Sequence, residues 1–174
     1  MNLVIPELSL VLLLGASGAG KSTFARKHFR ASEVLSSDYC RYLVSDDENN
    51  QAVTNDAFEV LRFIAAKRLA GAKLTVVDAT NVQPHARKPL LALAEQYHAS
   101  PVAIVLNVPP ATCLERNRVR TDRTLSPQVI ENQYQDLQRS MECLEPEGFR
   151  PVYVLNTVDQ IEAAVIVRGP CLIG

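Results

Sequence analysis

The sequence lacks several features that would assign a protein to a class at once. It has no tryptophan, only three scattered histidines, and no C-x-x-C pair among its four cysteines, so a zinc site is not indicated. The cysteines are Cys40, Cys113, Cys143 and Cys171. We expect them to be buried or free thiols in a reducing cytoplasm. The absence of tryptophan does not exclude base stacking, because arginine, tyrosine and phenylalanine also stack on bases.

The sequence also lacks a large excess of charge of either sign, and it has no long apolar run. The net charge of −1 over 174 residues excludes a generally basic nucleic-acid binder, so any polyanion must be held by a local patch. The N-terminal apolar run is too short to span a bilayer. Because no internal repeat or linker interrupts the chain, we expect residues 1–174 to form a single cytoplasmic domain without a membrane contact.

The most specific motif is a glycine-rich loop. The stretch "GASGAGKST" at residues 15–23 fits the pattern G-x-x-x-x-G-K-[ST] of a phosphate-binding P-loop, between an apolar run and a helix-compatible segment. Glycines let backbone N–H groups converge on phosphate oxygens, and the helix N-terminus adds a positive dipole end. We therefore expect ATP or another NTP, with Mg²⁺, rather than a turn without a ligand. The loop residues expected to bind it are Gly15, Ser17, Gly18, Ala19, Gly20, Lys21, Ser22 and Thr23.

Apolar runs of strand length alternate with helical patterns along the chain. Strands are expected around residues 9–14, 33–37, 73–78, 101–107 and 152–155. Helices are expected at about 21–30, 53–70, 84–98, 110–121, 127–144 and 158–167. This alternation predicts an α/β fold, a parallel sheet covered by helices on both faces. Ligands bind such sheets at the carboxyl ends of the strands, which directs attention to the residues just after each strand.

Two of the expected strands are followed by residues that could take part in catalysis or ligand binding. After the second, Asp38 could accept a proton from a hydroxyl group and Arg41 could hold an anionic acceptor. An exposed Asp38–Arg41 ion pair of little consequence is the alternative. After the third, Asp78 is either a Walker B type ligand of Mg²⁺ or a turn residue. Thr80 and Asn81 either form that turn or line an acceptor pocket, and the spacing does not decide between these roles.

Three arginines form the fourth candidate feature. Arg116, Arg120 and Arg123 are spaced i, i+4 and i+7, which predicts one helical face, and none has an acidic residue three or four positions away. Arginines four positions apart repel each other, and a bound anion would offset that cost. We therefore expect a mobile, arginine-bearing lid over the triphosphate, at about residues 110–145, in preference to a solvated helix face.

Together these segments resemble one family. The stretches "GASGAGKST", "SSDYCR", "VVDATN" and "RNRVRTDR" closely resemble the kinase module of bacterial polynucleotide kinase–phosphatase, an RNA end-healing and repair enzyme. The resemblance covers essentially the whole chain, including "LVSDDENNQ" at 43–51. It implies a P-loop fold like that of adenylate kinase, with the P-loop strand central in the sheet. It also implies transfer of the γ-phosphate of an NTP to the 5′-OH end of RNA or DNA, with Mg²⁺ or Mn²⁺.

The resemblance implies roles for individual residues. Asp38 would be the general base for the 5′-OH, and Arg41 would grip the phosphate on the 3′ side of the terminal nucleotide. Lys21 and Ser22 would serve the triphosphate and the metal. Asp78, from its position after a strand, is a further candidate metal ligand. The three lid arginines would contact the nucleotide. The expected catalytic set is Asp38, Lys21, Arg116 and Arg123.

The family enzyme continues into a metallophosphatase and a ligase-like domain. This chain ends at Gly174 with no K-x-D-G signature and no clustered His/Asp pattern, so we expect neither activity from it. Phosphatase and ligase domains or proteins of the same repair system are its expected partners. Two alternatives stay open. One is a small-molecule kinase for a sugar, nucleotide or adenylylsulfate-like acceptor, and the other is a non-catalytic, nucleotide-dependent switch.

Overall fold

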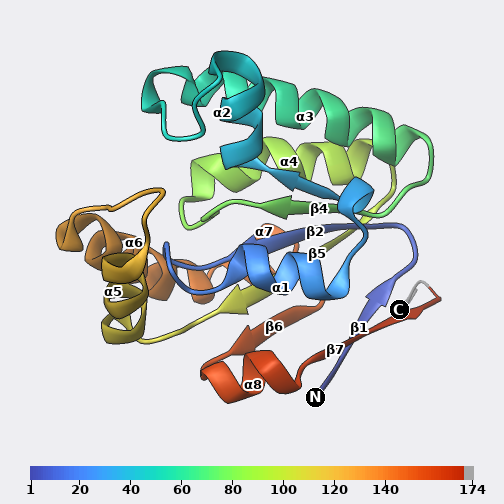
Figure 1. Cartoon of the computed structure of the whole chain (residues 1–174). Coiled ribbons are helices and arrows are strands. Elements are labelled where there is room, and N and C mark those ends of the chain that lie inside the picture. The colour runs from blue at the N-terminus through green and yellow to red at the C-terminus, as the bar shows by residue number, and fades with distance from the viewer. Residues whose placement is uncertain (171–174) are drawn as a thin grey trace.

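A computed structural model describes residues 1–170 and has a five-stranded parallel sheet at its centre (Figure 1). The strand order is β3 (Val34–Ser36), β4 (Thr75–Asp78), β2 (Ser9–Leu14), β5 (Ser100–Leu106) and β6 (Val152–Leu155). All five expected strands and the central place of the P-loop strand are confirmed. No helix within residues 1–170 is long and apolar enough to cross a membrane. Cys171 lies outside the described residues.

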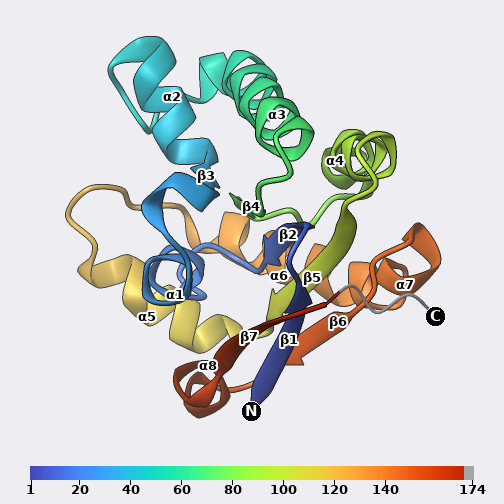
Figure 2. The ribbon, with the colours of Figure 1, turned by 90° about the vertical axis from the view of Figure 1, so that its right-hand side faces the viewer.

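Helices cover both faces of this sheet. They are α1 (Lys21–His28), α2 (Ser37–Ser45), α3 (Thr54–Ala70), α4 (Pro84–Gln96), α5 (Pro110–Val119), α6 (Pro127–Met141), α7 (Leu144–Glu147) and α8 (Val158–Ala163). Figure 2 shows α3 and α4 on one side of the sheet and α1, α5 and α8 on the other. The expected α/β architecture is therefore confirmed. α2 has no counterpart among the expected helices, and the long helix expected at 127–144 is interrupted before α7.

The central strand β2 explains the continuous apolar run just before the P-loop. Leu10, Leu12 and Leu14 point into the core beneath α3 and α4. Val11 and Leu13 point into the second core, which α1, α5 and α8 cover. All five side chains are fully buried. Successive residues of a strand face opposite sides, so a strand covered on both faces is apolar at every position.

A separate pair of strands corrects the helix expected over 158–167. Here α8 ends at Ala163, and β7 (Val165–Gly169) pairs in parallel with β1 (Asn2–Pro6). The run Val165–Val167 is β-branched throughout, which favours a strand over a helix because such side chains are restricted in a helix. On β1, Leu3 and Ile5 are fully buried in the second core. The pair of strands therefore extends the second core, on the face of the main sheet that α1, α5 and α8 cover.

An ion pair joins β7 to the segment that leads into β3. Both carboxylate oxygens of Glu33 accept hydrogen bonds from Arg168, at 2.8 and 2.7 Å. Burial opposes ionisation of Glu33, but the bonds from Arg168 and from the Arg30 N–H outweigh it and hold the pKa of Glu33 below its usual value. The pair therefore stabilises the folded state most when Glu33 is ionised.

This leads to a pH-dependent expectation for Arg168→Met. Its free energy of unfolding should fall by about 1 kcal/mol at neutral pH, since Arg168 is partly exposed and screened by solvent. The pKa of Glu33 is lower in the folded than in the unfolded state. The contribution of the pair is therefore complete above the unfolded pKa, near 4.5, and is lost as the pH falls through the folded pKa. Urea unfolding of both proteins across that range measures the difference, and a difference that grows toward acid pH would contradict this account.

Candidate active site

The P-loop lies between the end of β2 and the start of α1. Gly18 and Gly20 have φ values of +88° and +101°, in the left-handed region that glycine adopts without strain. The Gly15 N–H donates to the Thr80 carbonyl at 3.1 Å, which ties the loop to the segment after β4. The loop thus wraps around the N-terminus of α1 in the manner of an anion-binding site.

The Lys21 side chain is held against the P-loop backbone by two hydrogen bonds. Its Nζ donates to the carbonyl oxygens of Gly15 and Ala16, at 2.9 Å each, and the residue is only 9% exposed. Burial lowers the pKa of Lys21, and the nearby Asp78 carboxylate opposes that effect. An ammonium group has three donors, and these bonds use two. One N–H of Lys21 is therefore left to bind a phosphate oxygen.

Ser22 and Asp78 form the candidate metal site. The Ser22 hydroxyl donates to Asp78 Oδ2 at 2.7 Å, and Asp78 is 6% exposed. Burial raises the pKa of Asp78, while the bond from Ser22 and the charge of Lys21 oppose this. No group of three or more acidic, histidine or cysteine side chains within residues 1–170 forms a metal cage. One hydroxyl and one carboxylate suit Mg²⁺, which keeps several waters and shares the phosphates of its nucleotide.

The helix that sequence analysis missed, α2, positions Asp38 and Arg41. Ser36 caps it by accepting a hydrogen bond from the Tyr39 N–H at 3.2 Å. Asp38 lies in the first turn, and its Oδ1 accepts from Arg41 Nη1 at 2.7 Å. The Arg41 side chain is only 9% exposed, whereas that of Asp38 is 40% exposed. The pair is thus a buried arginine beside a partly exposed carboxylate that lines the cavity, and not the exposed pair considered as the alternative.

The three arginines do not share one helical face, so that expectation is wrong. Helix α5 ends at Val119, and Arg120 is already extended. The Asn117 side chain explains this, because it bonds both the N–H and the carbonyl group of Leu125, at 3.0 and 2.8 Å. These bonds turn the chain back on itself and compete with further helical turns. Arg120 and Arg123 consequently lie in the loop between α5 and α6.

Two of the arginines nevertheless make hydrogen bonds to residues of the site. Arg116 Nη1 donates to the Gly18 carbonyl of the P-loop at 3.0 Å. Arg123 Nη1 lies 3.3 Å from Asp38 Oδ1, the same oxygen that accepts from Arg41. The α5–α6 segment therefore touches the P-loop at one end and α2 at the other. Figure 1 shows this segment at the same end of the molecule as α2.

Arg120 differs from the other two because it has an acidic partner close in sequence. Its guanidinium bonds both carboxylate oxygens of Asp122, at 3.1 and 2.7 Å, and this bond lowers the pKa of Asp122 to about 2. Sequence analysis considered only partners three or four positions away and so missed a contact two positions along. The Asp122 carbonyl also accepts from Asn49 Nδ2 at 3.1 Å. This contact fixes the α5–α6 loop against the loop after α2.

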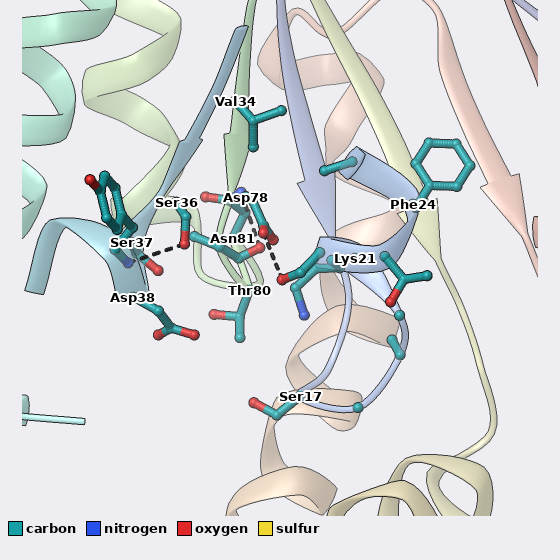
Figure 3. A pocket seen from close by; sticks show the side chains of 18 of the residues that line it. Ser17, Lys21, Phe24, Val34, Ser36, Ser37, Asp38, Asp78, Thr80 and Asn81 are labelled. Carbon is teal, nitrogen blue, oxygen red and sulfur yellow. Dashed lines mark hydrogen bonds between the residues drawn. The ribbon is translucent and has the colours of Figure 1, made fainter. Parts of the chain in front are cut away.

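All these groups meet in one cavity of about 1240 Å³. Of the expected site residues, those that line it are Ser17, Gly18, Ala19, Gly20, Lys21, Ser22, Thr23, Asp38, Arg41, Asp78, Thr80, Asn81, Arg116, Arg120 and Arg123. Figure 3 shows Asp38 and Lys21 on opposite sides of one space, with Thr80 between them. Pockets for one small ligand hold about 300–1,000 Å³, so this cavity has room for a nucleotide and a second substrate.

Asn81 borders the cavity, but its side chain is committed elsewhere. The residue is 2% exposed, and its Nδ2 donates to the Leu13 carbonyl of β2 at 2.8 Å. Its φ of +52° places it in the left-handed region, which asparagine tolerates better than most residues. Asn81 therefore holds the turn after β4 against β2, and we revise its expected role from substrate contact to positioning. Thr80 keeps its place on the cavity wall.

Comparison with known proteins identifies the family. Residues 10–144, well over half of the chain, match a family model described as an AAA domain. The chain belongs to this AAA domain family. A search of curated proteins found no match to this chain.

Solved structures confirm the kinase-like fold of this AAA domain. A chain of the Pnkp1/Rnl/Hen1 RNA repair complex matches with a TM-score of 0.67 and 22% identity, over 80% of this chain and 46% of that chain. A proposed kinase from Chloroflexus aurantiacus has a TM-score of 0.61 and 17% identity, over 88% and 85% of the two chains. The Mycobacterium tuberculosis APS kinase CysC, in complex with AMPPNP and APS, has a TM-score of 0.50 and 18% identity, over 80% and 99%.

These likenesses show a P-loop kinase-like fold. The AAA domain is a P-loop kinase-like domain, and such a fold binds a nucleotide. At these identities the likeness is one of fold alone. The AAA domain also spans less than half the length of the repair-complex chain that it matches.

The structure adds a residue that sequence analysis missed. Gln133, on α6, lines the cavity, and its Oε1 accepts from the Ser17 N–H of the P-loop at 2.9 Å. Its sequence context, a polar residue within a helical pattern, carries no signal for such a contact. The two residues are 116 positions apart, so only the tertiary structure of the AAA domain brings them together.

Gly18 provides a test of the contact between the P-loop and α5. A Cβ at Gly18 would lie 2.7 Å from the Cys113 carbonyl oxygen, in a left-handed conformation. We expect Gly18→Ala to lower the free energy of unfolding by about 2–3 kcal/mol and to weaken ATP binding. Gly20→Ala is the matched variant, because its Cβ would meet only the flexible Arg116 guanidinium, at 3.5 Å. Urea unfolding and calorimetric titration should show a smaller loss for Gly20→Ala, and equal losses would contradict a steric role for α5.

Proposed function

We propose that this AAA domain transfers the γ-phosphate of ATP or another NTP to the 5′-hydroxyl end of RNA or DNA in end-healing repair. The observation that carries the proposal is the placement of Asp38. Its carboxylate faces Lys21 and the P-loop across one cavity, with the buried Arg41 directly behind it. A base for the acceptor hydroxyl and a site for the phosphate donor thus face each other.

The proposed reaction is an in-line displacement. The 5′-oxygen forms a bond to the γ-phosphorus while the bond from that phosphorus to the β–γ bridging oxygen breaks, which leaves a 5′-phosphate end and an NDP. Asp38 accepts the proton of the 5′-OH. A carboxylate within hydrogen-bond reach of the hydroxyl can take this role. Most of the work of the protein is positioning and charge stabilisation, as in other phosphoryl transfers.

The arginines supply that stabilisation. Arg41 and Arg123 both bond one oxygen of Asp38, so two positive charges surround one negative charge on the acceptor side. The surplus charge suits a phosphate of the acceptor, and guanidinium groups match phosphate oxygens in shape. Arg116 and Arg120, from the α5–α6 lid, serve the donor phosphates. An arginine that acts on the transition state is worth ~10³–10⁵ in rate in related NTPases.

Ser22 and Asp78 would hold the metal ion. A Mg²⁺ or Mn²⁺ ion there would neutralise charge on the donor phosphates. The Ser22 hydroxyl would direct its oxygen toward the ion, and the buried Asp78 carboxylate would fix the hydroxyl from behind.

A polynucleotide acceptor is preferred to a small molecule because the cavity continues beyond Arg41. Glu48, Gln51 and Thr54, from the loop after α2 and the start of α3, line it there. The Tyr39 ring, 57% exposed at the cavity, lies 6.1 Å from the ring of Tyr42 in a stacked arrangement and offers an aromatic surface to bases. The likeness to a chain of an RNA repair complex supports the same acceptor. We propose phosphatase and ligase domains or proteins of the same repair system as its partners.

The test is transfer of γ-labelled phosphate in the presence of Mg²⁺. The purified protein is offered 5′-OH RNA and DNA oligonucleotides and, in parallel, a nucleoside, a sugar and adenylylsulfate. We expect label at the 5′ end of the oligonucleotides. Label on a small acceptor instead would favour a small-molecule kinase. Nucleotide binding or hydrolysis without transfer to any acceptor would favour the non-catalytic switch.

A further inference from the structure

Helix α6 is fastened to the site by a row of polar side chains. Gln133 bonds the P-loop at Ser17, and Asp136 accepts a hydrogen bond from Gln83 in the segment after β4. One turn further along, the Ser140 hydroxyl donates to a carbonyl of the same segment. On the neighbouring face of the helix Ile130 and Leu137 are fully buried. The backbone of α6 is therefore fixed, and Gln133 projects from a rigid element.

The orientation of the Gln133 amide group follows from its partner. The Ser17 N–H can only donate, so the oxygen of the Gln133 amide must face it, at 2.9 Å. The Nε2 group, with two N–H donors, then points away from Ser17. It has no hydrogen-bond partner among residues 1–170, although Gln133 is partly buried and lines the cavity. A pair of donors is thus left at the wall of the nucleotide site.

The position of Ser17 shows which phosphate these donors would meet. Lys21 Nζ bonds the carbonyl oxygens of the two residues just before Ser17, so the ammonium group lies beside the Ser17 peptide. A P-loop lysine contacts the β- and γ-phosphates. Figure 3 shows Ser17 and Lys21 at the border of the space that Asp38 faces. The free donors of Gln133 therefore lie at the end of the loop where the outermost phosphate meets the acceptor.

We propose that Gln133 recognises the γ-phosphate of the bound nucleotide. Its Oε1 holds the Ser17 N–H while its Nε2 donates to a γ-phosphate oxygen, so that a triphosphate gains a bond that a diphosphate lacks. The inference deepens the proposed function, since it rests on the nucleotide site of that reaction and not on the identity of the acceptor. Gln133 is thus a specificity residue for NTP over NDP.

The test compares binding of AMPPNP and ADP, each with Mg²⁺, by calorimetric titration. A hydrogen bond to a charged group corresponds to roughly 10-fold in affinity or more. For Gln133→Ala we expect AMPPNP affinity to fall by about that factor, while ADP affinity changes less than about twofold. Gln133→Glu should lose at least as much affinity for AMPPNP, because a carboxylate replaces the donor beside a negative phosphate.

Gln128→Ala is the matched control, because Gln128 lies on the same helix and is exposed, and within residues 1–170 its side chain bonds only Asn132. It should leave both affinities unchanged. Equal losses for AMPPNP and ADP in the Gln133 variants would overturn the proposal and leave Gln133 a support of the P-loop, and unchanged affinities would overturn it as well. If the wild-type protein binds neither nucleotide, the proposed function itself fails, which is a separate result.

Discussion

Asp38→Asn is expected to slow phosphate transfer to a 5′-OH oligonucleotide by about 10²–10⁴-fold while ATP binding stays near the wild-type level. Asparagine keeps the shape of the side chain and an oxygen that can accept from Arg41, which lies 2.7 Å from Asp38. It cannot accept the proton of the hydroxyl group. The loss should therefore be in kcat, with a small change in KM for the acceptor.

Single-turnover kinetics with γ-labelled ATP measures this effect, and calorimetric titration measures ATP affinity. Asp56→Asn is the matched control, since Asp56 lies in the first turn of α3 and is exposed. Undiminished kcat in Asp38→Asn would remove Asp38 as the general base. A rise in KM alone would leave it a residue that orients the acceptor through Arg41.

Glu147→Ala is expected to cost about 3–4 kcal/mol of the free energy of unfolding, because it leaves a buried arginine without its counter-ion. Arg87 is fully buried, and its guanidinium bonds both oxygens of Glu147, at 2.7 and 2.6 Å. The third guanidinium nitrogen, Nη1, donates to the Asn81 carbonyl at 2.9 Å and to the Ser140 hydroxyl at 3.0 Å. This cluster joins α4, α6 and α7 to the turn that follows Asp78.

Urea unfolding and thermal melting measure this loss, which corresponds to a fall in Tm of roughly 10 °C. Glu145→Ala is the control, because Glu145 lies on the same short helix, is exposed and has no ion pair within residues 1–170. The double variant Arg87→Met/Glu147→Leu should recover much of the loss, since removal of both charges leaves neither unpaired. If Glu147→Ala and Glu145→Ala have the same free energy of unfolding, the ion pair does not contribute measurably to stability.

The parts of the site that sequence analysis predicted depend on neighbours in sequence. The P-loop is nine consecutive residues after a strand, and the runs of β2 and β5 are apolar enough to mark buried strands. The position of Asp38 and Asp78 at the ends of strands then follows from the geometry of parallel sheets. This is why the meeting of Asp38, Asp78 and Lys21 at one edge of the sheet was predictable.

The parts that it did not predict depend on contacts between distant residues. Arg87 and Glu147 are 60 positions apart, and nothing local marks either as buried. The end of α5 is decided by the contact of Asn117 with Leu125, which overrides a helical spacing that the arginines suggested. In each case a polar side chain satisfies backbone or charged groups that only the folded chain brings within reach.

The pairing of β1 with β7 has a consequence for biosynthesis. Because the two strands are parallel and lie near opposite ends of the described chain, β1 leaves the ribosome long before its partner is made. Until then Leu3 and Ile5, which are fully buried in the finished protein, have no strand beside them. Contacts so distant in sequence form late, and apolar segments that stay exposed until then are prone to aggregate. A nascent chain that stalls before β7 therefore carries β1 without its paired strand, and synthesis of β7 is what completes the pair.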